Sequence, residues 1–299
     1  MNLIVSSRGN ITTKRMYKEH LTEYVTRLAK VKNKRDGTLK RWTVNLIKSG
    51  KRTPSIHASK VINWAYFDND IIGDIVYNNA EAIKLSSNKL KSRLVLQDNG
   101  VPVPLTYDLA EFNEESEIEY PAIIRPSHHF GGKDFIKVDS YSQVVSFKEE
   151  NSGTFYIAQY YPKQQEYRVH CGSGRFWITQ LKYKEDGTEI EHEIWNRAVS
   201  GFNFKPLRWR EVDERIVKVA LSAVHKLGLD FGAVDVLANP TNTDLPYAVV
   251  CEVNTCPGAK DYTRRKYCDY FKWLLSQDSK PDWEDYLEKS IDELIIKGE

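Results

Sequence analysis

The sequence has few cysteines, no internal repeats and no long hydrophobic run. Its four cysteines show neither C-x-x-C nor Cys/His spacing, so they are expected to be reduced thiols rather than metal ligands or disulfides. The longest apolar runs, such as residues 248–251, are far shorter than a membrane span. The first eight residues lack a basic region followed by an apolar core, so no secretion signal is expected. These absences favour a cytoplasmic protein.

Acidic residues are scarce at the start of the chain. The first 60 residues contain 15 Lys or Arg and only 3 Asp or Glu, whereas the remainder is acidic with 28 against 38. Nine of these bases lie between Lys30 and Arg52, around Trp42. Such a segment can attract nucleic acid or an acidic partner, although a solvated basic surface explains it equally simply. Both interpretations stay open.

The apolar pattern predicts a mixed α/β protein. Its 299 residues, 41% of them hydrophobic, can form two or three compact units. Asn88 can cap a helix that Gly100 ends. The other helices are expected at residues 14–30, 140–147, 211–227 and, as an acidic amphipathic segment, 281–299. Strands are expected at residues 3–5, 61–65, 71–77, 120–125, 135–138, 155–159, 167–171, 176–182, 231–238 and 247–254.

The last two strands carry a pattern typical of a metal site. Glu252 and Asn254 are two residues apart in an otherwise apolar strand, so their side chains point to the same side. Asp235 lies in the facing strand, at a position that can align with them. Two carboxylates and an amide oxygen form the hard donor set that Mg²⁺ prefers. An amphipathic hairpin with its polar side in water is the simpler alternative.

These residues, followed by Pro257 and Gly258, resemble the metal-binding end of ATP-grasp enzymes. Earlier segments resemble the same family in the same order over about residues 78–262: the segment 88–104 leading into the lid, the strand 120–126, the loop 127–133, the hinge 156–161 and Glu166-x-Arg168. The sequences of residues 166–170, 229–235 and 252–255 are most similar to those of poorly characterised bacteriophage-encoded ATP-grasp proteins. The resemblance implies an ATP-grasp fold with a small basic N-terminal α/β domain (1–80), a lid subdomain (81–160) and a C-terminal subdomain with the metal site (161–299).

The resemblance also implies roles for individual residues. The implied metal ligands are Asp235, Glu252 and Asn254. The implied nucleotide-binding residues are Lys89, Arg125, Gly131, Gly132, Lys133, Gln159, Tyr160, Tyr161 and Glu166. The residues expected to stabilise charge during catalysis are Arg168, Lys182 and Arg197, for which a surface salt bridge is the alternative at Lys182 and Arg197. Arg125 replaces the family's usual lysine, and Arg and Lys bind phosphate with different geometry.

The expected activity follows from these parts. The protein would use ATP and Mg²⁺, as two ions or with Mn²⁺ instead, to activate a carboxylate as an acyl phosphate and join it to an amine. The alternatives are a phosphotransferase of the same fold, or a nucleotide-gated protein that binds nucleic acid through residues 30–52. The expected partners are a carboxylate and an amine borne by a small molecule, a peptide or a modified nucleotide, and a homo-oligomer is compatible with the family. The expected location is the cytoplasm, that of the host cell if the protein is phage-encoded.

Overall fold

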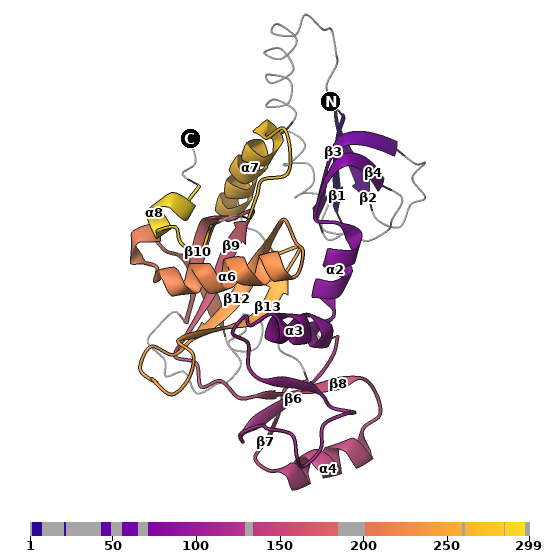
Figure 1. The fold of residues 1–299 in the computed structure, drawn as a ribbon, viewed down its shortest axis with the longest axis vertical. Helices are drawn as coiled ribbons and strands as arrows, with labels where there is room; N and C mark the ends of the chain where they lie inside the picture. The colour runs from indigo at the N-terminus through magenta and orange to yellow at the C-terminus, as the bar shows by residue number, and fades with distance from the viewer. Residues whose placement is uncertain are drawn as a thin grey trace, which may run out of the picture.

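The computed structural model describes residues 2–7, 21, 43–48, 56–64, 71–128, 134–184, 201–258, 261–283 and 285–296. In the described part the strands form three sheets (Figure 1). One sheet comes from the N-terminal region, a small one lies at the opposite end of the molecule, and a five-stranded sheet lies between them. No helix within the described ranges is long and apolar enough to cross a membrane.

The N-terminal sheet is parallel, with strand order β2-β1-β3-β4. The predicted strand at 71–77 is confirmed as β4, and the one at 61–65 is the second half of a longer strand, β3. The strand β2 was not predicted, because its apolar residues lie within a strongly basic region. The expected helix at 14–30 lies outside the described residues except for Leu21. The bounds are β1 (Asn2–Ser7), β2 (Thr43–Lys48), β3 (Ile56–Trp64) and β4 (Ile71–Tyr77).

Two short helices, α2 (Ala80–Ser87) and α3 (Lys89–Asp98), follow this sheet. The prediction for α3 is confirmed: the Asn88 side chain accepts a hydrogen bond from the Lys91 N–H at 3.0 Å, and Gly100 has a φ of 70°. The helix α2 was missed, although Asn79 caps it in the same way through the Ala82 N–H. Because Asn88 is both the C-cap of α2 and the N-cap of α3, the cap places Lys89 at the first turn of α3.

The small sheet has the order β5-β8-β6-β7 and is antiparallel. The strands expected at 120–125 and 135–138 pair as predicted, and α4 contacts β7 (Figure 1). The core of this unit contains Phe112, Ile124 and Ile157. The bounds are β5 (Thr106–Asp108), β6 (Ala122–Pro126), β7 (Ile136–Val138), α4 (Tyr141–Glu150) and β8 (Phe155–Gln159).

The central sheet is antiparallel, with the order β11-β10-β9-β12-β13, and α6 packs on one of its faces. The predicted hairpin of 231–238 and 247–254 is confirmed as β12 and β13. The predicted helix at 211–227 is also confirmed as α6, with a separate 3-10 turn at Trp209–Glu211. The bounds are β9 (Gln165–Gly172), β10 (Arg175–Lys184), β11 (Phe202–Pro206), α6 (Glu214–Lys226), β12 (Phe231–Ala238) and β13 (Ala248–Asn254).

The C-terminal region differs from the sequence prediction. The helix expected at 281–299 is wrong: within the described residues of that stretch only α8 (Ile291–Leu294) is helical. Asp285 has a φ of 59°, which no helix accommodates, and Ile295 forms a parallel bridge with Phe176. Tertiary packing explains the difference, since Tyr286 lies in the hydrophobic core with residues of α6, and Trp283 packs against this core and stacks on His225. The helix α7 (Asp261–Ser276) was not predicted.

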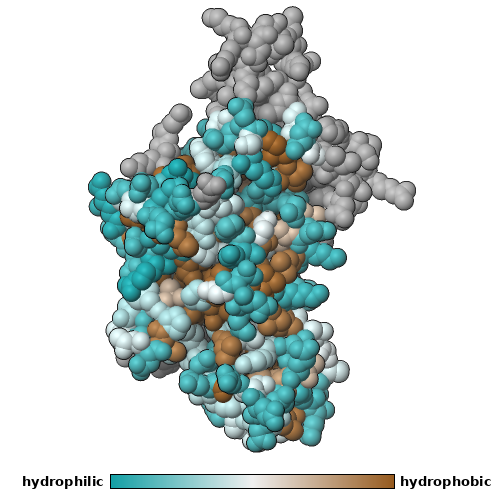
Figure 2. All heavy atoms as spheres, viewed as in Figure 1, coloured by the Kyte–Doolittle hydropathy of each residue, from teal (hydrophilic) through white to brown (hydrophobic). Residues whose placement is uncertain are grey.

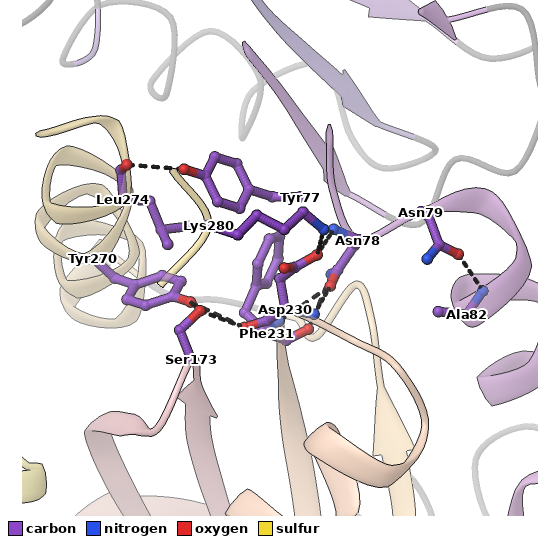
Figure 3. A network of polar contacts seen from close by, with 10 residues as sticks. All are labelled: Tyr77, Asn78, Asn79, Ala82, Ser173, Asp230, Phe231, Tyr270, Leu274 and Lys280. Atoms are coloured by element: carbon purple, nitrogen blue, oxygen red, sulfur yellow. Dashed lines mark hydrogen bonds and ion pairs between the residues drawn. The ribbon is translucent and has the colours of Figure 1, made fainter. Parts of the chain in front are cut away.

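A buried polar network joins the N-terminal sheet to the central sheet (Figure 3). The Asn78 backbone N–H donates to Asp230 Oδ2 at 2.6 Å, and its side chain bonds to the backbone of Asp230 and Phe231. Lys280 Nζ lies 2.8 Å from the same Oδ2, and Tyr270 donates to the Asp230 carbonyl oxygen. The chain just after β4, the beginning of β12 and the residues of and after α7 are thereby held together at one point.

The surface of the described part is mainly hydrophilic on the face drawn in Figure 2, with hydrophobic side chains in small scattered groups. Within the described part of the chain, the exposed large hydrophobic residues are Ile136, Val145, Tyr262 and Leu287. Scattered apolar residues of this kind are normal on protein surfaces.

Candidate active site

One face of the central sheet is apolar, and the other carries a group of polar side chains next to the apolar residues that pack on α7. Alternate residues of a strand point to opposite faces, so the apolar set Val169, Val234 and Val236 packs with α6. The residues between them form the opposite face, which carries the polar side chains Glu166, Arg168, His170, Gln180, Lys182, Asp235, Glu252 and Asn254. This face is the candidate active site.

Four of these residues form one row across four strands. Asp235 is paired with Glu252 on one side and with Arg168 on the other, and Arg168 is paired in turn with Gln180. The prediction that Asp235 aligns with the strand of Glu252 is confirmed. A register shift in β12 and β13 directly follows this pair, at Asp235/Val236. Such irregularities change the direction of side chains next to functional sites.

The Asp235 carboxylate accepts two hydrogen bonds from Arg168. Its Oδ1 lies 2.6 Å from Arg168 Nε and its Oδ2 lies 2.7 Å from Nη2. Burial raises the pKa of the Asp235 carboxyl, and the charge and hydrogen bonds of Arg168 oppose this effect. Two short contacts between one guanidinium and one carboxylate give the bidentate geometry that makes Arg–carboxylate pairs strong.

Glu252 pairs with a cation from a different element. Its Oε2 lies 3.1 Å from Lys89 Nζ, and its Oε1 accepts a hydrogen bond of 3.0 Å from Asn254 Nδ2. Burial raises the pKa of the Glu252 carboxyl, but the Lys89 charge, the Asn254 hydrogen bond and the Arg168 charge outweigh burial and hold it well below its ordinary value. The Glu252 side chain is therefore an anion. Lys89 reaches it from the first turn of α3.

Glu166 lies between two lysines. Lys163 Nζ is 2.6 Å from its Oε2, and Lys182 Nζ is 2.5 Å from its Oε1. Lys182 lies on β10 beside Arg168, and both cations also contact the ring of Phe204. The sequence analysis included Glu166 and Lys182 but missed Lys163. Its place three residues before Glu166, in the segment after the expected hinge, is the signal that could have identified it.

The small sheet presents Arg125 opposite Tyr156, on neighbouring strands β6 and β8. Arg93, which the sequence analysis also missed, lies over the Tyr156 ring at 5.4 Å and donates to the Cys251 carbonyl oxygen at 2.9 Å. Arg93 and Lys89 are four residues apart on α3, and helical residues at this spacing share a face. The helix thus places Lys89 against Glu252 and Arg93 against Cys251, the residue before Glu252 in β13.

The hinge residues are held in different ways. The Tyr160 backbone N–H donates to the Pro121 carbonyl oxygen, and its ring has Lys137 Nζ at 4.7 Å. The Gln159 side-chain Nε2 donates a hydrogen bond of 3.0 Å to Glu119 Oε2. Tyr161 is buried, and its hydroxyl donates to the Pro246 and Tyr247 carbonyl oxygens. Tyr161 therefore fixes the end of the hinge to the loop between β12 and β13.

The remaining candidate residues cannot be placed. Gly131, Gly132, Lys133 and Arg197 lie outside the described residues. His128, the last described residue before this gap, is exposed.

The donor set fits a divalent cation in its chemistry. Asp235 and Glu252 face each other across two strands, and Asn254 follows on the same side of β13. Carboxylate and amide oxygens are the ligands that Mg²⁺ prefers. Over the described ranges, no group of three or more His, Cys, Asp or Glu residues is placed to hold a metal. Any such site would therefore combine the two carboxylates with an amide or with oxygens of a substrate.

His170 lies on β9, two residues after Arg168 and on the same face. Its Nδ1 lies 2.9 Å from the Tyr267 hydroxyl and its Nε2 lies 3.1 Å from Gln180 Oε1. Burial lowers the pKa of His170 to about 3 from 6.5; the hydrogen bond with Gln180 opposes this shift and the Arg168 charge adds to it. The imidazole is therefore neutral in the folded protein at neutral pH.

This burial predicts a pH dependence of stability. Below pH 6.5 the unfolded chain binds a proton at His170 that the folded chain does not bind until about pH 3. The free energy of unfolding should therefore fall with decreasing pH, with about 1 kcal/mol per pH unit coming from this residue. Urea titrations of the wild type and of His170→Gln across this range should show a shallower fall for the variant. The exposed His128→Gln is the control, and equal slopes for wild type and His170→Gln would contradict the assignment.

The arrangement of sheets and site defines an ATP-grasp fold, and solved structures support this class. The chain is similar to D-alanine–D-alanine ligase from Bacillus anthracis, with a TM-score of 0.54 over 98% of this chain and 97% of that one, at 14% identity. It is also similar to the ATP-grasp ligase PsnB in complex with its minimal precursor, with a TM-score of 0.56 over 92% and 97% of the two chains, at 12% identity. Identities this low establish the fold alone.

Two curated relatives match parts of the sequence. The tetrahydromethanopterin:alpha-L-glutamate ligase of Methanocaldococcus jannaschii is 26% identical over 194 residues, which are 61% of this chain and 62% of the relative. The carbamoyl-phosphate synthase of Methanobrevibacter smithii is 28% identical over 99 residues, 32% of this chain and 26% of the relative. The chain thus spans less than two thirds of either relative. No protein-family model matches it.

Proposed function

We propose that the protein is an ATP-dependent carboxylate–amine ligase. The observation that carries this proposal is the row formed by Arg168, Asp235 and Glu252, in which two carboxylates and a cation converge on the polar face of an ATP-grasp fold. Lys89 adds a second cation from α3. Phosphoryl transfer from ATP requires both kinds of group, because cations must surround the γ-phosphoryl group and carboxylates would hold the metal that neutralises its charge.

The residues of the site would divide these tasks. Asp235, Glu252 and Asn254 would hold Mg²⁺, as one or two ions, and Mn²⁺ has the same preference for oxygen ligands. When bound, the metal would neutralise charge on the phosphate oxygens. The cations Lys89, Arg125, Arg168 and Lys182 would orient the triphosphate. Gly131, Gly132, Lys133 and Arg197 keep the nucleotide-binding and catalytic roles expected from the sequence.

The hinge side of the site would bind the nucleoside. Structures of the two similar ligases include one complexed with ATP and one with Mg and ADP. In this chain Gln159, Tyr160 and Tyr161 would border the adenine, and Glu166 would bind the ribose after releasing one of its lysines. Tyr161 would act through its anchoring to the loop 246–247, which holds the hinge against the central sheet.

The reaction would proceed in two transfers. A substrate carboxylate oxygen attacks the γ-phosphorus, the bond to the β-phosphate oxygen breaks, and ADP leaves. The resulting acyl phosphate is attacked by an amine, an amide bond forms, and phosphate leaves with the electron pair of the acyl–oxygen bond. Arg168 and Lys182 would stabilise the charge that develops on the transferred group, so catalysis would come from preorganised charge and orientation.

The chemistry of the similar proteins narrows the substrate class. Two of the similar proteins are named as ligases of L-glutamate or D-alanine, and the ligase PsnB is complexed with a minimal precursor. An amino acid or peptide is therefore the first acceptor class to test. Nucleic-acid binding through residues 30–52, self-association, a cytoplasmic location and a bacteriophage origin stay predictions from the sequence. None of the proteins named above is described as a phage protein.

The test is a screen for ADP release with pairs of carboxylates and amines, followed by mass spectrometry of the products. We expect ADP and phosphate in equal amounts, with a product whose mass equals that of the two substrates less one water. Each substrate alone with ATP is the control. Phosphate found on a stable acceptor would instead establish a phosphotransferase. No turnover, together with salt-dependent nucleic-acid binding lost on charge reversal across residues 30–52, would establish the nucleotide-gated binding protein.

A further inference from the structure

The carboxylates and cations of the candidate site are paired with each other. Both oxygens of Asp235 are bound by Arg168, at 2.6 and 2.7 Å. Glu252 is bound by Lys89 at 3.1 Å. These pairs are largely shielded from water, since the side chains of Arg168 and Asp235 are 17% and 8% exposed and those of Lys89 and Glu252 are 11% and 26% exposed. In each pair, the carboxylate is a residue that the proposed function assigns to the metal, and the cation is a residue that it assigns to the triphosphate.

A triphosphate without a metal would compete with these carboxylates for the same donors. If Arg168 turned to a phosphate oxygen, Asp235 would remain as a buried carboxylate without its counter-charge, next to a polyanion. Removing one partner of a buried ion pair is costly because the remaining charge has lost its solvation. The same applies to Lys89 and Glu252. Binding of metal-free nucleotide would therefore require two buried ion pairs to break, and each break makes the free energy of binding less favourable.

A metal-complexed triphosphate would leave no buried carboxylate without a counter-charge. The carboxylates would exchange a side-chain cation for a divalent cation, and the released guanidinium and ammonium groups would turn to phosphate. Every charge would keep a partner of opposite sign. The free energy of binding then depends on whether the nucleotide arrives together with its metal.

We propose that Asp235 and Glu252 determine the specificity of the site for metal-complexed over metal-free nucleotide, by keeping Arg168 and Lys89 in ion pairs until a divalent cation replaces them. This proposal rests on the proposed function, since it assumes that the site binds a nucleoside triphosphate. It differs from simple metal ligation in one consequence. A pure metal ligand affects nucleotide affinity only when metal is present, whereas these carboxylates also weaken binding when metal is absent.

The test measures equilibrium binding of the β,γ-imido analogue of ATP by calorimetry, in Mg²⁺ and in EDTA. Asp235→Asn and Glu252→Gln each remove one negative charge at nearly constant volume and act on different cations. In EDTA each variant should bind the analogue about tenfold more tightly than the wild type, a difference of about 1.4 kcal/mol. In Mg²⁺ each should bind it more weakly. Circular dichroism and a thermal melt establish that the variants are folded.

A matched control exists on α6. Asp213, the N-cap of α6, forms the same two-point pair with Arg215, at 3.0 and 2.7 Å, but the two side chains are 30% and 59% exposed and the pair lies outside the polar face. Asp213→Asn should change neither affinity. Adenosine is the second control, because it lacks phosphates and should bind the wild type and all variants equally in EDTA.

The outcomes separate this inference from the proposed function. If the wild type binds the analogue in Mg²⁺ but folded Asp235→Asn and Glu252→Gln bind it in EDTA no better than wild type, the inference is overturned and the proposed function stands. If the wild type binds the analogue in neither condition, the proposed function itself fails. Tighter binding of the analogue in EDTA, with unchanged binding of adenosine, supports the inference.

Discussion

Replacing Glu252 by glutamine should lower the rate of ADP release by about 10³-fold, equivalent to about 4 kcal/mol of transition-state stabilisation. The substitution keeps the shape of the side chain and its ability to accept the Asn254 hydrogen bond, but it removes the charge that would hold a divalent cation. Lys89 also loses its partner at 3.1 Å. Asp235→Asn should have a comparable effect through the neighbouring strand.

The measurement is ADP release at saturating substrates, on protein whose fold has been checked by circular dichroism. Glu214→Gln is the control, because Glu214 forms an exposed pair with Lys218 on α6 and should turn over normally. A folded Glu252→Gln enzyme with normal turnover would show that the metal lies elsewhere. The turnover reports on loss of the metal, whereas the affinity measured in EDTA reports on release of Lys89 or Arg168. Together the two measurements separate these effects.

Replacing Gly172 by alanine should lower the free energy of unfolding by about 3 kcal/mol or more. A Cβ at this position would lie 2.2 Å from the Asp230 carbonyl oxygen and 2.6 Å from the Phe231 Cα. Both atoms belong to backbone, so no rotation of a side chain can relieve the overlap. Gly172 is paired with Phe231, four residues before Asp235 on β12, so a displacement there would also disturb the pairing of Asp235 with Arg168.

Urea unfolding of Gly172→Ala against Gly258→Ala tests this expectation. No heavy atom lies within 4 Å of a Cβ built on Gly258, so that variant should stay within about 0.5 kcal/mol of wild type. Equal stability of the two variants would contradict the close approach of β9 and β12. If Gly172→Ala is recovered only in inclusion bodies while Gly258→Ala is soluble, the loss of stability is also supported.

Strong local patterns predicted the central part of the molecule. The β12–β13 hairpin has two apolar strands separated by a turn-rich segment, and its register was correctly expected to bring Asp235 to Glu252. The helix α3 was predicted from its caps, because Asn88 and Gly100 act through their own backbone neighbourhood. Local hydrogen bonding and side-chain alternation suffice for such elements.

Elements stabilised mainly by distant contacts were missed or misassigned. The helix α7 contains Tyr267, Tyr270 and Phe271, whose aromatic rings pack on Trp64, Trp177 and Phe231 from other parts of the chain. Within the described residues of 281–299, turns and irregular chain replace most of the expected helix, because Tyr286 packs in the core with residues of α6 and Ile295 pairs with Phe176. In both cases tertiary packing outweighed local propensity.

The amino-acid sequence was sufficient to place Glu252 and Asn254 on a common face, because strand alternation alone does so, and the resemblance to ATP-grasp enzymes added Glu166 and Arg168 as candidates. The sequence could not show which carboxylate pairs with which cation. The pairing of Arg168 with Asp235, of Lys89 with Glu252, and of Lys163 and Lys182 with Glu166 depends on strand order and on the position of α3. Strand order and helix position are set by packing between segments far apart in the chain, so only the folded structure determines which cation each carboxylate holds.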